Sequence, residues 1–266
     1  IAFAKTIRTV AIGCIVGGGL FGLAKMYKTF LAIFSDIGSA FRGDGSAEYI
    51  EGKGWYEWPL KHIPIFMVVT FFSMIAIFTL GGFPVVASAL FATVLIATTF
   101  MLGAIAVRVM GETGIEPVSG TSFIVLLLLL GVFLGAQESL GLDTQEAVLL
   151  GLVGTTVFGS AISMSGTVIG DYKNSLYIGN RPYHISKGNI MGVVPGAIFG
   201  AGVAIFLSIQ LANGNIDLLA PQANAFATFS VIFAEGQGDL LLLGLGLLLG
   251  MFVEWATGMG TSFGLG

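Results

Sequence analysis

The feature that most constrains this chain is a series of long apolar stretches separated by short polar segments. A helix needs roughly 20 apolar residues to cross the hydrocarbon core of a bilayer, which is about 30 Å thick. By this measure we predict about seven spans, at residues 9–24, 59–80, 85–110, 122–136, 146–169, 190–211 and 240–255. A short interfacial or re-entrant helix is expected at residues 224–234. The predicted fold is all-α, a polytopic transmembrane helical bundle that forms one transmembrane domain over residues 1–266.

Composition excludes several other classes of protein. Hydrophobic residues make up 55% of the chain and charged residues only 10%, whereas soluble domains carry about 25% charged residues. A water-soluble fold of this composition would expose large apolar patches. The net charge of −4 gives no indication of nucleic-acid binding. A single cysteine, Cys14, excludes a disulfide framework and is interpreted as a packing residue. We expect no cofactor.

Two polar connections, residues 38–58 and 170–189, are predicted to be cytoplasmic loops. This orientation follows if residues 137–145, which contain no Lys or Arg, face outward. Nine of the eleven Lys and Arg residues then lie on the cytoplasmic side, in agreement with the positive-inside rule. The sequence begins at Ile1 rather than Met and stops in an apolar stretch. We therefore expect it to be a fragment of a longer protein.

The first candidate site is the segment 111–121, which lies between a long and a short predicted span. Three glycines and a proline in this segment disfavour a continuous helix, so we expect it to be broken or re-entrant. Unwound backbone at membrane depth must be buried in protein or line a water-filled cavity. Broken helices with ionisable groups form substrate and ion sites in many secondary transporters. The alternative is an ordinary cytoplasmic turn with its acids in water. The candidate pathway residues are Glu112, Thr113, Glu116, Pro117 and Ser119.

Two further groups are candidates for chemistry. Asp171 and Lys173, in the second predicted loop, could form a gating or structural pair, or could simply be solvated. Glu254 ends a long apolar run. If it is buried, it is a candidate for proton binding, because desolvation favours the neutral carboxyl; otherwise it lies at headgroup level. No phosphate-binding loop, zinc-protease motif or nucleophile elbow occurs, so neither ATP hydrolysis nor enzymatic activity is expected.

At these two segments the sequence resembles the oligopeptide transporter (OPT) superfamily, which includes the yellow-stripe-like metal-chelate carriers. Prokaryotic members carry a Gly-Glu-Thr-Asp-Ile-Asn-Pro type of segment, which here reads Gly111-Glu112-Thr113-Gly114-Ile115-Glu116-Pro117. A second family loop has the form Asp-x-Lys-Thr-Gly-Tyr-x-x-Gly-Ala-x-Pro, and Asp171, Lys173, Gly179 and Pro182 match it in spacing. Residues 220–224, Ala-Pro-Gln-Ala-Asn, resemble a third family segment. Gly114, Asn174 and Ser175 depart from the family pattern, and these departures bear on the substrate.

The resemblance implies a secondary active, proton-coupled transporter (a symporter) of oligopeptides or metal-chelate, siderophore-like molecules. It implies an integral protein of a prokaryotic cell (inner) membrane whose partners are a peptide or chelate substrate, protons and the lipid bilayer. A homo-oligomer is compatible with the sequence. The alternatives from other classes are a passive channel and a membrane scaffold without transport activity. Spans two to four offer almost no polar stripe for a channel.

Overall fold

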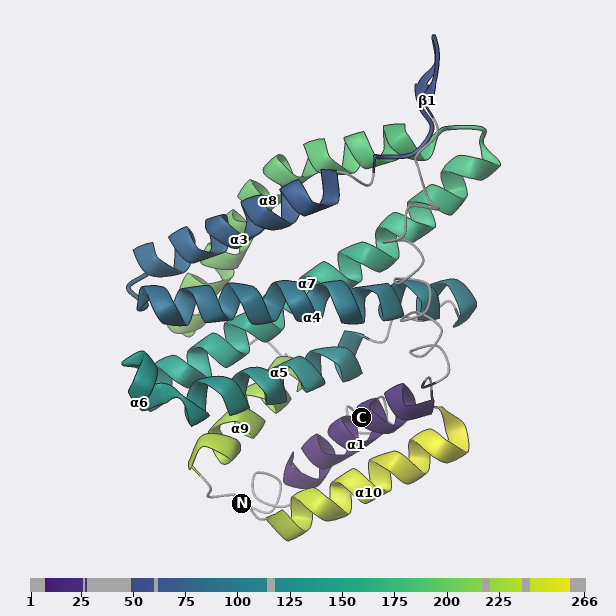
Figure 1. The fold of residues 1–266 in the computed structure, drawn as a ribbon. Coiled ribbons are helices and arrows are strands. Elements are labelled where there is room, and N and C mark those ends of the chain that lie inside the picture. The colour runs from purple at the N-terminus through teal and green to yellow at the C-terminus, as the bar shows by residue number, and fades with distance from the viewer. Residues whose placement is uncertain are drawn as a thin grey trace.

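The computed structural model describes residues 8–25, 27, 49–59, 62–113, 118–216, 221–235 and 240–258. Within these residues the chain is a helical bundle with one small hairpin (Figure 1). The helices are α1 (Arg8–Lys25), α3 (Ile63–Leu80), α4 (Val85–Thr113), α5 (Val118–Gly135), α6 (Gln137–Leu140), α7 (Thr144–Tyr177), α8 (Pro182–Ala212), α9 (Pro221–Glu235) and α10 (Leu240–Thr257). The predicted all-α membrane bundle is thereby confirmed.

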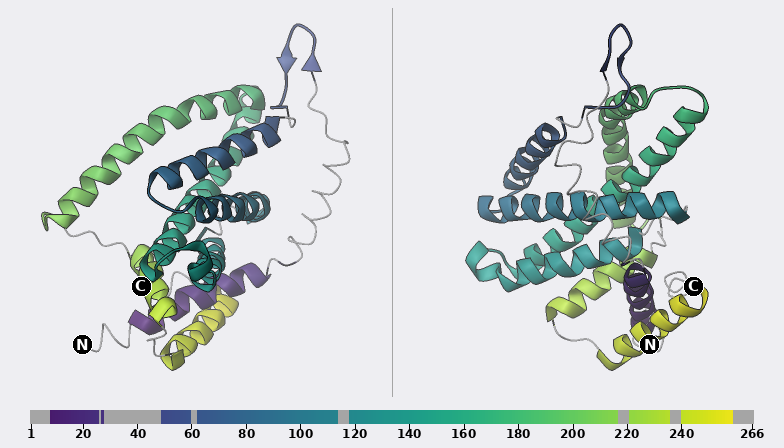
Figure 2. Two further views of the ribbon diagram at one scale, coloured as in Figure 1. Left: turned by 60° about the vertical axis from the view of Figure 1, so that its left-hand side comes forward. Right: turned by 45° about the vertical axis from the view of Figure 1, so that its right-hand side comes forward.

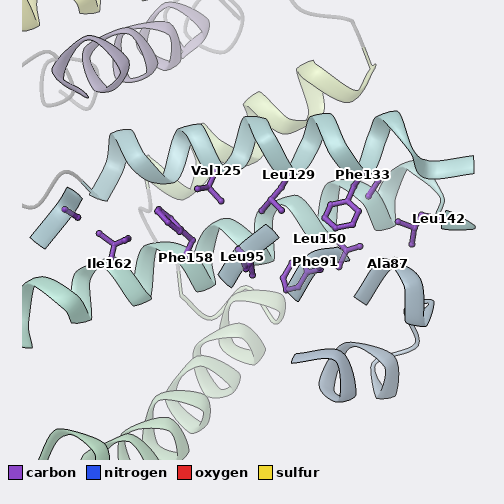
Figure 3. Packing of buried hydrophobic residues seen from close by; sticks show 12 residues of the cluster. Ala87, Phe91, Leu95, Val125, Leu129, Phe133, Leu142, Leu150, Phe158 and Ile162 are labelled. Carbon is purple, nitrogen blue, oxygen red and sulfur yellow. The ribbon is translucent and has the colours of Figure 1, made fainter. Parts of the chain in front are cut away.

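The helices α4, α5 and α7 form the centre of the bundle. Their buried side chains interlock in one apolar cluster, in which Phe91, Leu129 and Phe158 are fully buried (Figure 3). Gly154 of α7 makes this close packing possible. A Cβ atom at Gly154 would lie 2.5 Å from Leu129 Cδ1 and 2.9 Å from Phe91 Cε2. Such a methyl group would force the core apart.

The other face of α5 packs against α1 and α9. Phe123, Leu126 and Leu130 of α5 meet Val16 of α1 and Phe229 of α9 in a second buried cluster. Because α5 buries apolar residues on both sides, it is hydrophobic all around, as expected for a helix surrounded by protein or lipid. This central position also brings the first turn of α5 between α7 and α9.

The helices α1 and α10 contact each other through glycine. They lie side by side in both views of Figure 2. A Cβ atom at Gly246 would overlap the main-chain oxygen of Val10, and one at Gly250 would overlap that of Cys14. Gly13 and Gly17 of α1 are equally close to the main chain of α10. Small residues at such positions let two helix backbones approach closely in a membrane, where no hydrophobic effect drives them together.

The outer helices α3 and α8 expose many apolar side chains. None of the residues of α3 is buried, and in α8 only Pro182 and Ser186 are. Beyond its first turns α8 leaves the rest of the bundle (Figure 2, left). A Cβ atom at Gly192, Gly196 or Gly200 would meet no atom within 4 Å. Apolar surface of this extent is stable in lipid and not in water.

Four described helices are long and apolar enough to cross a membrane: α3, α4 within residues 85–104, α7 and α8. Shorter apolar stretches of 10–17 residues lie in α1, α5, α9 and α10. Each of the seven predicted spans coincides with a helix, and the helix predicted at residues 224–234 is α9. Which of the shorter helices cross the bilayer completely depends on tilt and local bilayer thickness.

The prediction of a loop over residues 170–189 is wrong at the level of secondary structure. Helix α7 continues to Tyr177 and α8 begins at Pro182, so only residues 178–181 connect them. The 34 residues of α7 span about 51 Å at 1.5 Å per residue, longer than the hydrocarbon core. Its polar end therefore continues as helix beyond the apolar region. The Tyr172 hydroxyl lies 2.7 Å from the Ser186 hydroxyl and joins the two helices.

The segment 111–121 is more helical than predicted. Residues 111–113 are the last turn of α4, and residues 118–121 are the first turn of α5. Gly111 and Gly120 are therefore within helices, because one glycine weakens a helix without breaking it. Residues 114–117 lie outside the described part of the chain, so the expected break stays a prediction.

Most of the predicted loop at residues 38–58 lies outside the described residues. Its end forms an antiparallel hairpin of β1 (Tyr49–Ile50) and β2 (Gly54–Trp55). The hairpin is fixed to the start of α8, where Tyr183 N donates to Tyr56 O at 3.1 Å and the rings of Trp58 and Tyr183 stack at 5.3 Å. This aromatic contact was not predicted from the sequence.

The start of α7 is fixed by a capping box. Asp143 Oδ1 accepts from Glu146 N at 2.6 Å, and Glu146 Oε2 accepts from Asp143 N at 3.0 Å.

Replacing Asp143 with alanine is expected to lower the free energy of unfolding by about 1 kcal/mol, because the main-chain N–H group of Glu146 loses its acceptor. Thermal unfolding in detergent measures the change. Gln145→Ala, at an exposed position in the same turn, is the control and should be neutral.

Candidate functional site

The predicted pathway residues lie at the junction of α4 and α5. Glu112 and Thr113 are in the last turn of α4, and Ser119 is in the first turn of α5, although their side chains lie outside the described ones. Glu116 and Pro117 lie outside the described residues altogether. The end of α4 and the start of α5 are therefore only four residues apart in the sequence. The orientation of the two glutamates stays a prediction.

A cavity of about 580 Å³ begins at this junction and lies between α5, α7 and α9. We call it the α5–α7–α9 cavity. It is lined by Val118 and Ser122 of α5, by Leu152, Thr155, Thr156, Gly159 and Ser160 of α7, and by Ala223, Phe226 and Ala227 of α9. Val118 is the first residue of α5. The cavity therefore opens directly beside the segment that the sequence singled out.

Small residues on two helices create the space. Gly159 of α7 faces Ser122 of α5, and a Cβ atom at Gly159 would lie 3.1 Å from Ser122 Oγ. On the third side, α9 contributes Ala223 and Ala227. Larger side chains at these positions would fill the volume. The cavity is therefore a consequence of the glycine and alanine positions.

Four hydroxyl groups line the otherwise apolar cavity. Three of them, on α7, donate to main-chain carbonyl groups of their own helix: Thr155 to Gly151 at 2.8 Å, Thr156 to Leu152 at 3.0 Å and Ser160 to Thr156 at 2.9 Å. The fourth, Ser122 Oγ, is buried without a hydrogen-bond partner among the described residues. The whole Ser122 residue is only 4% exposed. An unpartnered buried hydroxyl in a cavity is a candidate ligand contact.

The sequence analysis missed Ser122, Thr155 and Thr156, and the signal that could have found Thr155 is periodic. Gly151, Thr155 and Gly159 recur at intervals of four residues, so they share one face of α7. Glycine and hydroxyl residues on one helical face indicate close packing with polar groups. No comparable periodicity identifies Ser122.

Asp171 and Lys173 are not brought together. They lie two positions apart near the end of α7, and residues at this separation point to different sides of a helix. In the described part of the chain, no ion pair or hydrogen bond joins the two side chains. Asp171 is half-buried and Lys173 is exposed. Their gating or structural role stays a prediction.

Glu254 lies in the contact between α10 and α1. Its side chain is half-buried, and a Cβ atom at Gly22 of α1 would lie 3.3 Å from Glu254 Oε1. The ammonium group of Lys25 donates to the main-chain oxygen of Glu254 at 2.8 Å. Glu254 does not line the α5–α7–α9 cavity. Its surroundings are those of a carboxylate packed between two helices near their ends.

The described residues contain no cluster of three or more His, Cys, Asp or Glu side chains that could hold a metal ion. In a comparison with known families, the family model described as OPT oligopeptide transporter protein matches residues 2–260. Comparison with curated proteins gives no match, and comparison with solved structures gives none either. The family match extends over nearly the whole chain, including the three segments that carry the resemblance.

Proposed function

We propose, because this chain belongs to the OPT oligopeptide transporter family, that it carries oligopeptides or metal-chelate molecules across a membrane by secondary active, proton-coupled transport. We place the protein in the inner membrane of a prokaryotic cell. The observation that supports a transport site is the α5–α7–α9 cavity beside the junction of α4 and α5. It is about 580 Å³ in volume, within the range of roughly 300–1,000 Å³ found for small-molecule sites.

Alternating access is the mechanism that this arrangement favours. Cavities next to interrupted helices commonly hold the substrate in secondary transporters, while one repeat or bundle moves against the other. The contact of α5 with α9 includes the rings of Phe123, Phe226 and Phe229. We propose that α9 moves relative to α5 and α7 to expose the cavity first to one side and then to the other.

Proton coupling requires a carboxyl group that is neutral in one state and charged in the other. The candidates are Glu112 and Glu116, which precede the lining residue Val118 in the sequence, and Glu254, which is half-buried between α1 and α10. Moving one charge across the membrane is worth about 2.3 kcal/mol per 100 mV. This corresponds to more than about tenfold accumulation of a solute.

The test is proton-driven uptake by proteoliposomes that contain the full-length protein. Separate Glu112→Gln, Glu116→Gln and Glu254→Gln variants each remove one candidate carboxylate with little change in shape. In at least one of these variants we expect substrate accumulation under a proton gradient to fall by more than about tenfold. Exchange of internal for external substrate should be retained. Glu138→Gln, at an exposed position in α6, is the control.

Two results would count against this mechanism. Full pH-dependent uptake in all three variants would exclude these carboxyl groups as coupling residues. Flux that rises linearly with substrate concentration, without saturation, would favour the passive channel instead. A membrane scaffold would show neither uptake nor exchange.

A further inference from the structure

We infer that, if the α5–α7–α9 cavity lies on the transport path as proposed, it receives an uncharged amide group of the substrate. In this arrangement Ser122 on α5 donates a hydrogen bond to the amide carbonyl, and hydroxyl oxygens on α7 accept hydrogen bonds from the amide N–H. The cavity thereby selects neutral groups that carry both a donor and an acceptor. Carboxylate groups of a chelate fit it poorly.

The α7 side of the cavity presents acceptors. A hydroxyl group has one proton and two lone pairs. The protons of Thr155, Thr156 and Ser160 are already donated to carbonyl groups within α7, at 2.8, 3.0 and 2.9 Å. These three oxygens therefore offer lone pairs to a ligand and have no proton left to donate. A group that binds here has to bring its own N–H or O–H.

The α5 side presents a donor. Ser122 Oγ has no hydrogen-bond partner in the described part of the chain, although its residue is only 4% exposed. A buried polar group without a partner is unfavourable, and native proteins contain few of them. Rotation of the Ser122 side chain toward the cavity would let a substrate carbonyl accept its hydrogen bond, and this would remove the cost. The hydroxyl lies in the second turn of α5, so the positive end of the helix dipole is close by and favours a carbonyl oxygen there.

The uncharged part of the lining that the structure describes argues against a carboxylate. None of the ten described residues that line the cavity is Asp, Glu, Lys, Arg or His. An anion would lose its hydration without gaining a cation, and burial of an unpaired charge is costly. An amide has one acceptor and one or two donors and needs no counter-charge. The hydroxyl groups on the facing helices α5 and α7 meet both requirements.

The test uses three probes and the purified full-length protein. The probes are acetyl-tetraalanine dimethylamide, its analogue methylated at all four alanine nitrogens, and ferric citrate as a carboxylate chelate. Equilibrium binding is measured for wild type, Ser122→Ala and Ser160→Ala. Ser163→Ala, an exposed serine three residues along α7 that does not line the cavity, is the matched control.

We expect Ser122→Ala to bind the capped peptide about tenfold more weakly than wild type, since one hydrogen bond to the carbonyl is lost. Ser160→Ala should weaken binding of the capped peptide but leave binding of the methylated analogue unchanged, because that analogue has no N–H to donate. Ser163→Ala should bind every probe as wild type does. Binding of ferric citrate, where it occurs, should be unaffected by Ser122→Ala.

A stability measurement separates a binding role from a structural one. A hydroxyl that holds the fold together would lower the thermal midpoint when removed. Because Ser122 Oγ is buried without a partner, Ser122→Ala should leave the midpoint unchanged or raise it. The only cysteine, Cys14, is buried, so its labelling by a thiol-reactive dye on heating reports unfolding.

The amide subsite would be overturned by any of three results. These are wild-type affinity for the capped peptide in Ser122→Ala, equal affinity of wild type for the capped and methylated peptides, or no binding of the capped peptide by wild type. If wild type accumulates ferric citrate under a proton gradient but binds no peptide, the subsite is wrong and the proposed transport stands. If the expected binding pattern appears without proton-driven uptake of any probe, the coupling is wrong and the subsite stands.

Discussion

Gly246→Leu is expected to separate α10 from α1, whereas Gly244→Leu should leave the two helices in contact. A Cβ atom at Gly246 would overlap the main-chain oxygen of Val10 and lie 3.0 Å from its Cα atom. Neither helix backbone can move away without breaking the remaining glycine contacts. Overpacking of this kind costs about 3 kcal/mol or more. At Gly244, two positions earlier in the same helix, a Cβ atom would meet nothing within 4 Å.

Cys14 gives a direct readout of this prediction. It is only 2% exposed, and its main chain is in contact with the position of a Cβ atom at Gly250 of α10. In Gly246→Leu we expect faster labelling of Cys14 by a thiol-reactive dye at ambient temperature and a lower thermal midpoint. Gly244→Leu should label at the wild-type rate, and its midpoint should be equal or higher because leucine favours helix over glycine. Equal labelling rates in the two variants would show that α1 and α10 do not pack as described.

The positions of the helices could be predicted from hydropathy, because each crosses or enters an apolar phase. The stretch predicted at residues 85–110 is α4, which ends at Thr113, and the stretch predicted at 240–255 is α10. In a bilayer every backbone polar group must be satisfied within the segment, so a long apolar run has one folded form available. The ends of helices outside the apolar phase are not determined in this way. The polar residues 170–177 were therefore predicted as loop although they continue α7.

The cavity could not be predicted in the same way, because it depends on which helices become neighbours. Ser122, Gly159 and Ala227 are far apart in the chain, and nothing in the hydropathy of α5, α7 or α9 indicates that they face one another. The glutamates at 112 and 116 were recognisable because charge near an apolar run is rare. Ser122 was not, because a serine at the start of an apolar run is also a common helix terminus. Its buried, unpartnered hydroxyl becomes apparent only when α7 and α9 are in place.

Ala227→Phe is expected to abolish transport while leaving the fold intact. Ala227 is half-buried on α9 and lines the α5–α7–α9 cavity, whose volume is about 580 Å³. An aromatic ring can enter this space without displacing the core residues of α4, α5 and α7. It would also cover the hydroxyl groups of Thr156 and Ser160, so the substrate would lose several hydrogen bonds of about 1 kcal/mol each. We expect uptake to fall by about tenfold or more.

The same substitution two turns further along α9 provides the control. Ala234 lines a different cavity between α7 and α9, of about 330 Å³, with Thr144 and Val148. Ala234→Phe adds the same ring to the same helix but leaves the α5–α7–α9 cavity open. Initial uptake rates in proteoliposomes, with Cys14 labelling as the test of folding, should therefore differ between the two variants. If Ala227→Phe transports at the wild-type rate, the α5–α7–α9 cavity does not lie on the path of the substrate.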